Sequence, residues 1–270
     1  MVFFPSTSQK LVSLVLVIFT TWFLLVNSEK SVSFNINNFN YNKPDIILRG
    51  SAKISDYGYL ALTDPNDSTL LVGHALYSKP VPIWDGPSGN VARFVTSFYF
   101  DVENVGDSKP ADGFVFFLAP DSEIPNNSSG GHLGIVDRNK DLNNFVGVEL
   151  DNYVNSWDPK YSHIGINFNS LMSLKTVPWN RADKALSHVT ITYDSISKTL
   201  TVVLADQNGQ FTTLGQVLDL KEMLPETVRI GFSASTSRAS RQLHNIRSWY
   251  FGSVLKTDNN STTNSIASDA

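Results

Sequence analysis

The stretch 189–204 reads VTITYDSISKTLTVVL, and it predicts a pair of antiparallel strands. Branched and aromatic residues fill 189–193 and 200–204, as is typical of strands. The polar residues 194–199 between them are typical of a hairpin turn. This part of the chain therefore favours an antiparallel β fold.

Strand patterns continue on both sides of this hairpin. Ala92–Phe100 has near period-two spacing, and Gly113–Leu118 is a continuous apolar run, as expected of a strand covered on both faces. Val228–Ala234 and Ile246–Phe251 predict two later strands, and only Leu218–Leu224 suggests a helix, of barely two turns. The sequence shows no long amphipathic helix, no βαβ alternation and no linker. We therefore predict one all-β domain, an antiparallel β-sandwich.

The two ends of the chain differ from the rest. Leu11–Val26 is almost entirely apolar and is followed by polar and small residues, so 1–28 is predicted to be a secretory signal peptide. A membrane anchor is the alternative, although a spanning helix needs roughly 20 residues. The polar stretch 257–270 is predicted to be a flexible tail, which leaves 29–256 as the domain. We expect a protein of the secretory pathway, extracellular or vacuolar, with no membrane segment after processing.

Composition limits the function further. The formal net charge of −4 and the lack of a basic run argue against nucleic acid as a partner. The chain has no cysteine, so its stability must come from its core or from bound metal. Asparagines in glycosylation sequons predict a glycoprotein, unless the sequons are chance matches that are never used. They are Asn66, Asn126, Asn127, Asn259 and Asn260.

Residues 149–163, ELDNYVNSWDPKYSH, hold the strongest chemical signal. Glu149 and Asp151 lie two apart on a predicted strand and project to one side. Asn155 and Asp158 follow in a loop, and His163 opens the next strand. Oxygen ligands suit calcium, and an imidazole among carboxylates suits a manganese- or zinc-like ion. Spacing alone leaves two alternatives open, a solvated acidic loop and a two-metal hydrolase. No second histidine or further acid cluster lies nearby in the sequence to complete a hydrolytic site.

Several motifs resemble the legume lectin family. The segment Val146–Tyr153, with Trp157–Pro159 and His163–Ile166, is similar to that family's metal-binding signature. Further similar segments are 75–78, 82–85, 89–92, 111–120, 231–234 and 248–249. The likeness covers Ser31 to about Leu255 and implies a jelly-roll sandwich with a flat back sheet and a curved front sheet.

The resemblance also implies two bound ions, Ca2+ and Mn2+ or a similar transition-metal ion. Glu149, Asp151, Asp158 and His163 would hold the transition-metal ion. Calcium would take Asp151, Asp158, Asn155 and the backbone carbonyl of Tyr153.

A sugar site is implied in the same way. Asp112, after a cis peptide bond from Ala111, would accept hydrogen bonds from the sugar; without the resemblance it would be taken for a turn residue. The backbone N–H of Gly131 and the amide of Asn155 would donate to the sugar, and Tyr153 would stack on its apolar face.

The loop Ser235–Leu243 lacks the family's usual glycine, and it contributes Ser237 and Arg238 as candidate sugar contacts. Its length is similar to that of fucose-binding members, which favours L-fucose, then galactose or N-acetylgalactosamine, then mannose or glucose. The expectation is a carbohydrate-binding protein, not an enzyme, that binds glycans as a homodimer or homotetramer. The alternative is a lectin-like defence, inhibitor or storage protein without sugar binding.

Overall fold

The protein's computed structural model describes residues 28–64, 71–106, 110–120, 123–140, 144–237 and 241–257. The predicted leader and tail overlap these ranges only at Ser28 and Thr257, so both, and the domain limits between them, stay predictions. Among the described residues, no helix is long and apolar enough to cross a membrane.

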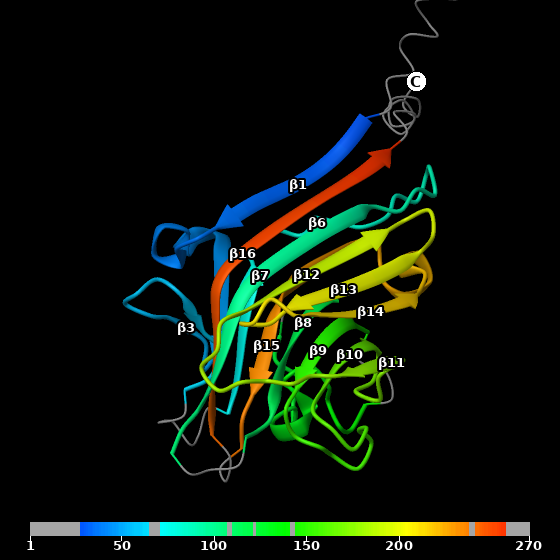
Figure 1. Ribbon diagram of the computed structural model, residues 1–270. Helices are drawn as coiled ribbons and strands as arrows, with labels where there is room; N and C mark the ends of the chain where they lie inside the picture. The colour runs from blue at the N-terminus through cyan, green and yellow to red at the C-terminus, as the bar shows by residue number, and fades with distance from the viewer. Residues whose placement is uncertain are drawn as a thin grey trace, which may run out of the picture.

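The described chain forms two antiparallel sheets that pack face to face, as predicted (Figure 1). The back sheet has the order β14-β13-β12-β7-β16-β4-β3, and β1 also pairs with β16. Its strands are β1 (Ser28–Ile36), β3 (Lys53–Ile54), β4 (Leu60–Ala61), β7 (Arg93–Asn104), β12 (Ser187–Asp194), β13 (Thr199–Ala205), β14 (Phe211–Val217) and β16 (Gln242–Thr257).

The front sheet has the order β11-β10-β9-β8-β15-β5-β2, and β6 also pairs with β15. Its strands are β2 (Ile46–Gly50), β5 (Val72–Tyr77), β6 (Val81–Pro82), β8 (Gly113–Ala119), β9 (Val146–Asp151), β10 (His163–Phe168), β11 (Lys175–Pro178) and β15 (Thr227–Ser235). The helical segments are short: η1 (Phe39–Tyr41), η2 (Lys43–Asp45), η3 (Gly130–His132) and α2 (Leu220–Met223).

The strand predictions are confirmed, and most strands are longer than their apolar cores suggested. The predicted hairpin is β12 and β13, paired antiparallel from His188↔Ala205 to Asp194↔Thr199. The predicted helix is only one turn, α2. Asp219 caps its start by accepting the N–H of Lys221, and Leu224 is already in extended conformation.

The main core fills the space between the sheets. Phe98 of β7, Phe232 of β15 and Trp249 of β16 are fully buried there, and both Phe98 and Trp249 meet Phe232 with ring centroids 4.9 Å apart. These edge-to-face contacts join the two sheets through large apolar side chains.

A second, smaller core covers the other face of the front sheet. Every residue of β8 is buried, as the apolar run predicted. Phe114 and Phe116 face the main core, whereas Phe117 packs with Leu133 and Ile135 of the loop after η3. The outer face of β8 is therefore covered by the loop after η3, which holds that loop against the front sheet.

The register of the front sheet aligns four strand ends in one row. His163 of β10 lies opposite Asp151 of β9, Asp151 lies opposite Gly113 of β8, and Gly113 lies opposite Ser235 of β15. The loops that precede or follow these residues consequently meet at one edge of the sheet.

Candidate functional site

Three of the predicted metal ligands form a buried cluster at this edge. Glu149 and Asp151 lie two apart on β9, and His163 lies directly across from Asp151. All three are at most 2% exposed, and one ligand atom from each lies within 4.8 Å of the others. His163 Nε2 is 3.0 Å from Glu149 Oε1. Strand periodicity and register thus produce a compact group of two carboxylates and an imidazole.

Ser173, which lies before β11, supports this cluster from the side. Its hydroxyl donates a hydrogen bond to Glu149 Oε1 and accepts one from Asn167 Nδ2 at 3.3 Å. A side chain at Gly165 would collide with both Ser173 and Glu149, so a glycine is needed there. Groups that orient a ligand in this way contribute to metal affinity.

Asp158 and Asn155 approach the cluster from the β9–β10 loop. Asp158 Oδ2 accepts the backbone N–H of Asn155 at 2.6 Å, which closes a tight turn. The negative charge of Asp158 raises the pKa of Asp151, so the two carboxylates are near neighbours. Glu149, Asp151 and His163 thus form the compact cluster, and Asp158 lies within electrostatic range of it.

The cluster has the properties expected of a cation site. Burial, followed by the charges of Glu149 and Asp158, raises the pKa of Asp151 well above its ordinary value. Burial also raises the pKa of Asp158. Glu149 Oε2 and Asn155 Oδ1 are buried without a hydrogen-bond partner among the described residues. Gathered carboxylates and orphaned oxygens are unfavourable alone and are satisfied by a bound cation, so these residues fit a metal.

Asp112 lies beside the cluster, after a cis peptide bond from Ala111, as predicted. Its carbonyl accepts the N–H of Asn152 at 2.9 Å, and its own N–H donates to the Ser235 carbonyl at 3.3 Å. The carboxyl is 4% exposed, its Oδ2 has no hydrogen-bond partner among the described residues, and burial raises its pKa to about 7. Asp112 therefore presents a preformed acceptor that lacks a donor.

Gly130 and Gly131, at the start of η3, lie close to both Asp112 and Asn155. A Cβ at Gly131 would lie 2.5 Å from Asn155 Oδ1, and one at Gly130 would lie 4.0 Å from the Asp112 carboxyl. The Ser235 hydroxyl also donates to the Gly130 carbonyl. Asp112, Gly131 and Asn155, which come from three separate loops, thus converge. Tyr153, at 41% exposed, supplies an open aromatic face on the same loop as Asn155.

The loop after β15 is anchored at both ends. Thr236 Oγ1 donates to the Ala111 carbonyl at 3.3 Å and accepts the N–H of Gln242 at 3.4 Å. Ser237 lies partly buried at the start of this loop. Arg238 lies outside the described residues, so its predicted sugar contact stays a prediction, as does that of Ser237.

Gln242, at the start of β16, also links the loop after β15 to the β9–β10 loop by hydrogen bonds. Its Oε1 accepts from Asn152 Nδ2 at 3.1 Å, and its Nε2 donates to Asn104 Oδ1 at 2.8 Å. Arg181 Nη2 donates to the same Asn104 oxygen at 2.9 Å. Sequence reasoning missed Gln242 and Ser173, because nothing in the linear pattern distinguishes them from other polar residues.

Comparison with known proteins identifies the family. The family model described as the legume lectin domain matches residues 31–267. The chain belongs to the legume lectin family. It is 47% identical to a non-seed lectin of Pisum sativum over 267 residues, 97% of each chain. It is also 47% identical to the galactose-binding lectin of Arachis hypogaea over 251 residues, 89% of this chain and 91% of that one.

The same family appears among solved structures. A seed lectin of Lotus tetragonolobus superposes with a TM-score of 0.80 at 52% identity, and the match covers 84% of this chain and 100% of that one. The resemblance noted in the sequence is therefore confirmed, and so is the jelly-roll sandwich that it implied.

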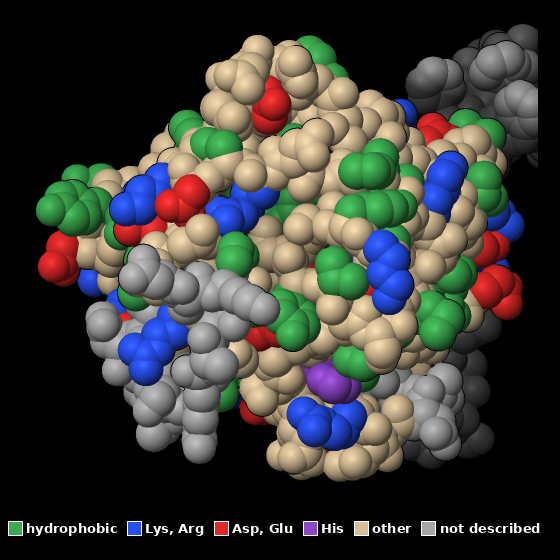
Figure 2. Space-filling model, turned by 60° about the horizontal axis from the view of Figure 1, so that its bottom comes forward, with side chains coloured by type: hydrophobic (Ala, Val, Ile, Leu, Met, Phe, Trp, Pro, Cys, Tyr) green, Lys and Arg blue, Asp and Glu red, His purple; other side chains and the backbone are tan. Residues whose placement is uncertain are grey.

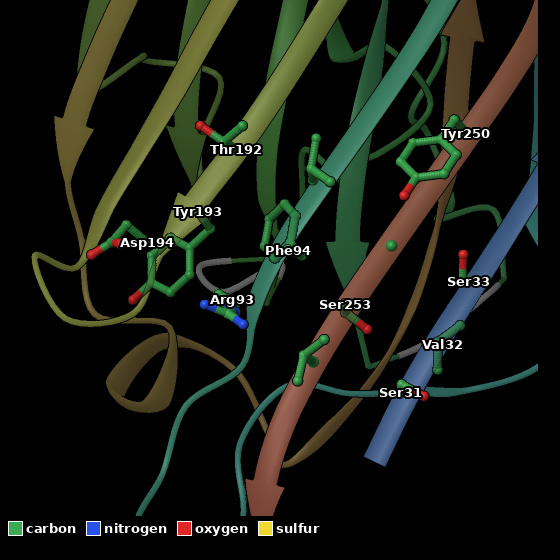
Figure 3. A pocket seen from close by; sticks show the side chains of 13 residues that line it. Ser31, Val32, Ser33, Arg93, Phe94, Thr192, Tyr193, Asp194, Tyr250 and Ser253 are labelled. Atoms are coloured by element: carbon green, nitrogen blue, oxygen red, sulfur yellow. The ribbon is translucent and has the colours of Figure 1, made fainter. Parts of the chain in front are cut away.

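A hollow of this legume lectin also lies away from the front-sheet edge, on the other sheet. A depression of about 560 Å3 on the back sheet is lined by residues of β1, β7, β12 and β16, among them Arg93, Asp194 and Tyr250 (Figure 3). The Asp194 carboxylate accepts the N–H groups of Ile196 and Ser197 in its own turn. This hollow contains none of the acid, imidazole and glycine groups that converge at the front-sheet edge.

Proposed function

We propose that this legume lectin binds carbohydrate at the front-sheet edge, that binding depends on metal, and that no reaction is catalysed. The observation that carries the proposal is the convergence of Asp112, Gly131 and Asn155 beside a buried acid–histidine cluster. A carboxylate accepts hydrogen bonds from sugar hydroxyls, and a backbone N–H and an amide donate to them. Tyr153 offers a ring for the C–H face of a hexose.

In this proposal the metal ions have a structural role and no catalytic one. A transition-metal ion would be held by Glu149, Asp151, Asp158 and His163. Calcium would be held by Asp151, Asp158, Asn155 and the Tyr153 carbonyl. When bound, these ions neutralise the gathered carboxylates. The chain's own contribution is to position Asn155 against Gly131 and Asp112 at the edge of the sheet.

Related proteins support sugar as the ligand. One relative is named a galactose-binding lectin, and solved structures of similar chains include a lectin complexed with galactose and one with the methyl glycoside of α-L-fucose. We take L-fucose as the first candidate, because the length of the loop Ser235–Leu243 resembles that of fucose-binding members. Galactose or N-acetylgalactosamine is the second.

Affinity for one monosaccharide should be roughly millimolar, because the proposed site offers only a few hydrogen bonds and one ring face. Several sites in a homodimer or homotetramer would add about 10²–10⁴-fold in avidity. The protein is proposed to act on glycans in the secretory pathway, outside the cell or in the vacuole.

A glycan array with and without chelator tests the function. We expect sugar binding that disappears when metal is removed and returns when calcium and manganese are added back. Full binding by the metal-stripped protein would disprove the role of metal. A folded, metal-loaded protein that binds no glycan would support the alternative, a defence, inhibitor or storage protein.

Gly131→Ala tests the geometry of the site. Its Cβ would push the Asn155 amide aside, so sugar affinity should fall at least about tenfold. The transition-metal ion, whose proposed ligands do not include Asn155, should be retained, as measured by elemental analysis. Gly215→Ala is the matched control, because a Cβ there meets nothing closer than 3.9 Å. Unchanged sugar affinity in Gly131→Ala would place the sugar elsewhere.

A further inference from the structure

A pocket of about 350 Å3 borders the proposed sugar site without including its residues. Its walls include His132, Trp157, Arg138, Lys140 and Met172. Its volume lies within the range of pockets that hold small ligands, roughly 300–1,000 Å3, and is large enough for one sugar unit.

The chain connects this pocket to the sugar site on two sides. His132 directly follows Gly131, and Trp157 lies between Asn155 and Asp158. The His132 and Trp157 rings meet edge to face, with centroids 5.5 Å apart. This ring pair stands on the border, so a glycan whose first unit contacts Gly131 and Asn155 would extend past it into the pocket.

The pocket has a partly apolar floor and a fixed wall. Leu171 is buried among the residues of the second core, and Trp157 and Met172 remain partly or largely exposed. Asn169 is anchored to Phe145 by two hydrogen bonds, one through its N–H at 3.0 Å and one through its Oδ1 at 3.1 Å. A partly exposed indole beside fixed polar groups is the usual surface on which a sugar ring packs.

The exposed charged side chains among the described residues of this pocket are positive. Arg138 and Lys140 are both exposed, and neither forms an ion pair with any other residue that the structure describes. Arg138 Nε donates to the Asn127 carbonyl at 3.1 Å, which fixes the guanidinium while its terminal nitrogens stay available. Among the described residues of the lining, Asp137 is the one that is acidic; it is 4% exposed, and its carboxylate accepts the N–H of Asn139 within its own turn.

We propose that this pocket is an extended subsite for an anionic glycan unit, one that carries a carboxylate or a sulfate. The Trp157 ring would cover the C–H face of that unit, and Arg138 and Lys140 would bind its anion. Guanidinium groups match carboxylate and sulfate oxygens with paired hydrogen bonds. The proposal rests on the sugar-binding function proposed above and adds a class of ligand to it.

The test is an array of matched triplets, in which the same fucose- or galactose-ended oligosaccharide is neutral, carboxylated or sulfated. The full-length, metal-loaded protein should bind the anionic forms about tenfold more tightly than the neutral form, and added NaCl should reduce this preference. Comparing the carboxylated and sulfated forms identifies which anion is preferred.

Arg138→Gln/Lys140→Gln should remove the preference and leave affinity for the neutral form unchanged. The matched control is Lys43→Gln/Lys79→Gln, which also removes two positive charges but from residues outside the pocket lining. Equal binding of neutral and anionic forms by the unmodified protein would overturn the subsite and leave the sugar site intact. No binding to any form would overturn both, and an anion preference that survives the Arg138/Lys140 double substitution would place the anion elsewhere.

Discussion

Two groups of polar residues lie next to the β9–β10 loop, one buried and one partly buried, and they are built in opposite ways. The acid cluster of Glu149, Asp151 and His163 gathers like charges and leaves polar atoms without partners. The amide network of Gln242, Asn152 and Asn104 is neutral, and both polar atoms of the Gln242 side chain are hydrogen-bonded. The first group fits a bound cation that would satisfy its charges, whereas the Gln242 side chain of the second group finds its partners within the protein. We therefore expect metal and pH to affect the acid cluster, and substitutions to be needed to disturb the amide network.

Asp151→Asn should have the largest effect. The amide keeps the hydrogen bond that Asp151 Oδ1 accepts from the Tyr153 N–H at 2.7 Å, but it removes one buried negative charge. We expect loss of metal and a decrease in sugar affinity of more than about 100-fold, together with a higher melting temperature of the metal-free protein. Elemental analysis, calorimetry and thermal melts check these outcomes. A metal-free variant less stable than the unmodified metal-free protein would refute the repulsion assigned to this cluster.

The metal-free protein should lose stability between about pH 4 and 7. The pKa of Asp112 is raised to about 7, so the folded state keeps a proton that the unfolded chain releases above about pH 4. The folded state then binds more protons, and the free energy of unfolding falls as pH rises, by up to about 4 kcal/mol from this group. The raised pKa values of Asp151 and Asp158 act in the same direction.

Urea denaturation at several pH values in chelator measures this decrease. Metal binding needs ionised carboxylates, so metal affinity should rise over the same window, and the metal-loaded protein should not show the decrease. Stability of the metal-free protein that rises from pH 4 to 7 would contradict the assignment.

Gln242→Ala should destabilise the protein by about 2–3 kcal/mol, because Asn152 and Asn104 each lose a buried partner. Metal should still bind, since no ligand is removed, and urea denaturation in excess calcium measures the loss. Gln216→Ala is the matched control, and it should change the free energy of unfolding by no more than about 0.5 kcal/mol. The Gln216 amide donates an exposed hydrogen bond to the neighbouring Val217 carbonyl. Loss of metal in Gln242→Ala would show that the two groups are one cooperative unit.

Ser173→Ala should have the smallest effect. It removes the hydroxyl that donates to Glu149 Oε1, which orients a ligand without touching the metal. Metal affinity should fall about tenfold, and stability by about 1 kcal/mol. Competition with a metal indicator dye measures the affinity. An effect as large as that of Asp151→Asn would mean that Ser173 contributes more than orientation.

Much of the acid cluster could be predicted because its members are close in the sequence. Glu149 and Asp151 share a strand face by period two, and His163 returns on the next strand after one loop. The all-β class and the individual strands were predictable for the same reason, since alternating and continuous apolar runs are local signals.

Contacts between distant segments were decided only by the tertiary structure. Gln242 meets Asn152 and Asn104, which lie 90 and 138 positions away, and no local pattern links them. The single helical turn of α2 and the loop that covers β8 also depend on packing. Local sequence patterns thus identified the candidate ligand residues and the strands that bear them. The register that aligns Asp151, Gly113 and Ser235 in one row determined which loops meet, because pairing between strands depends on the whole core and not on any one segment.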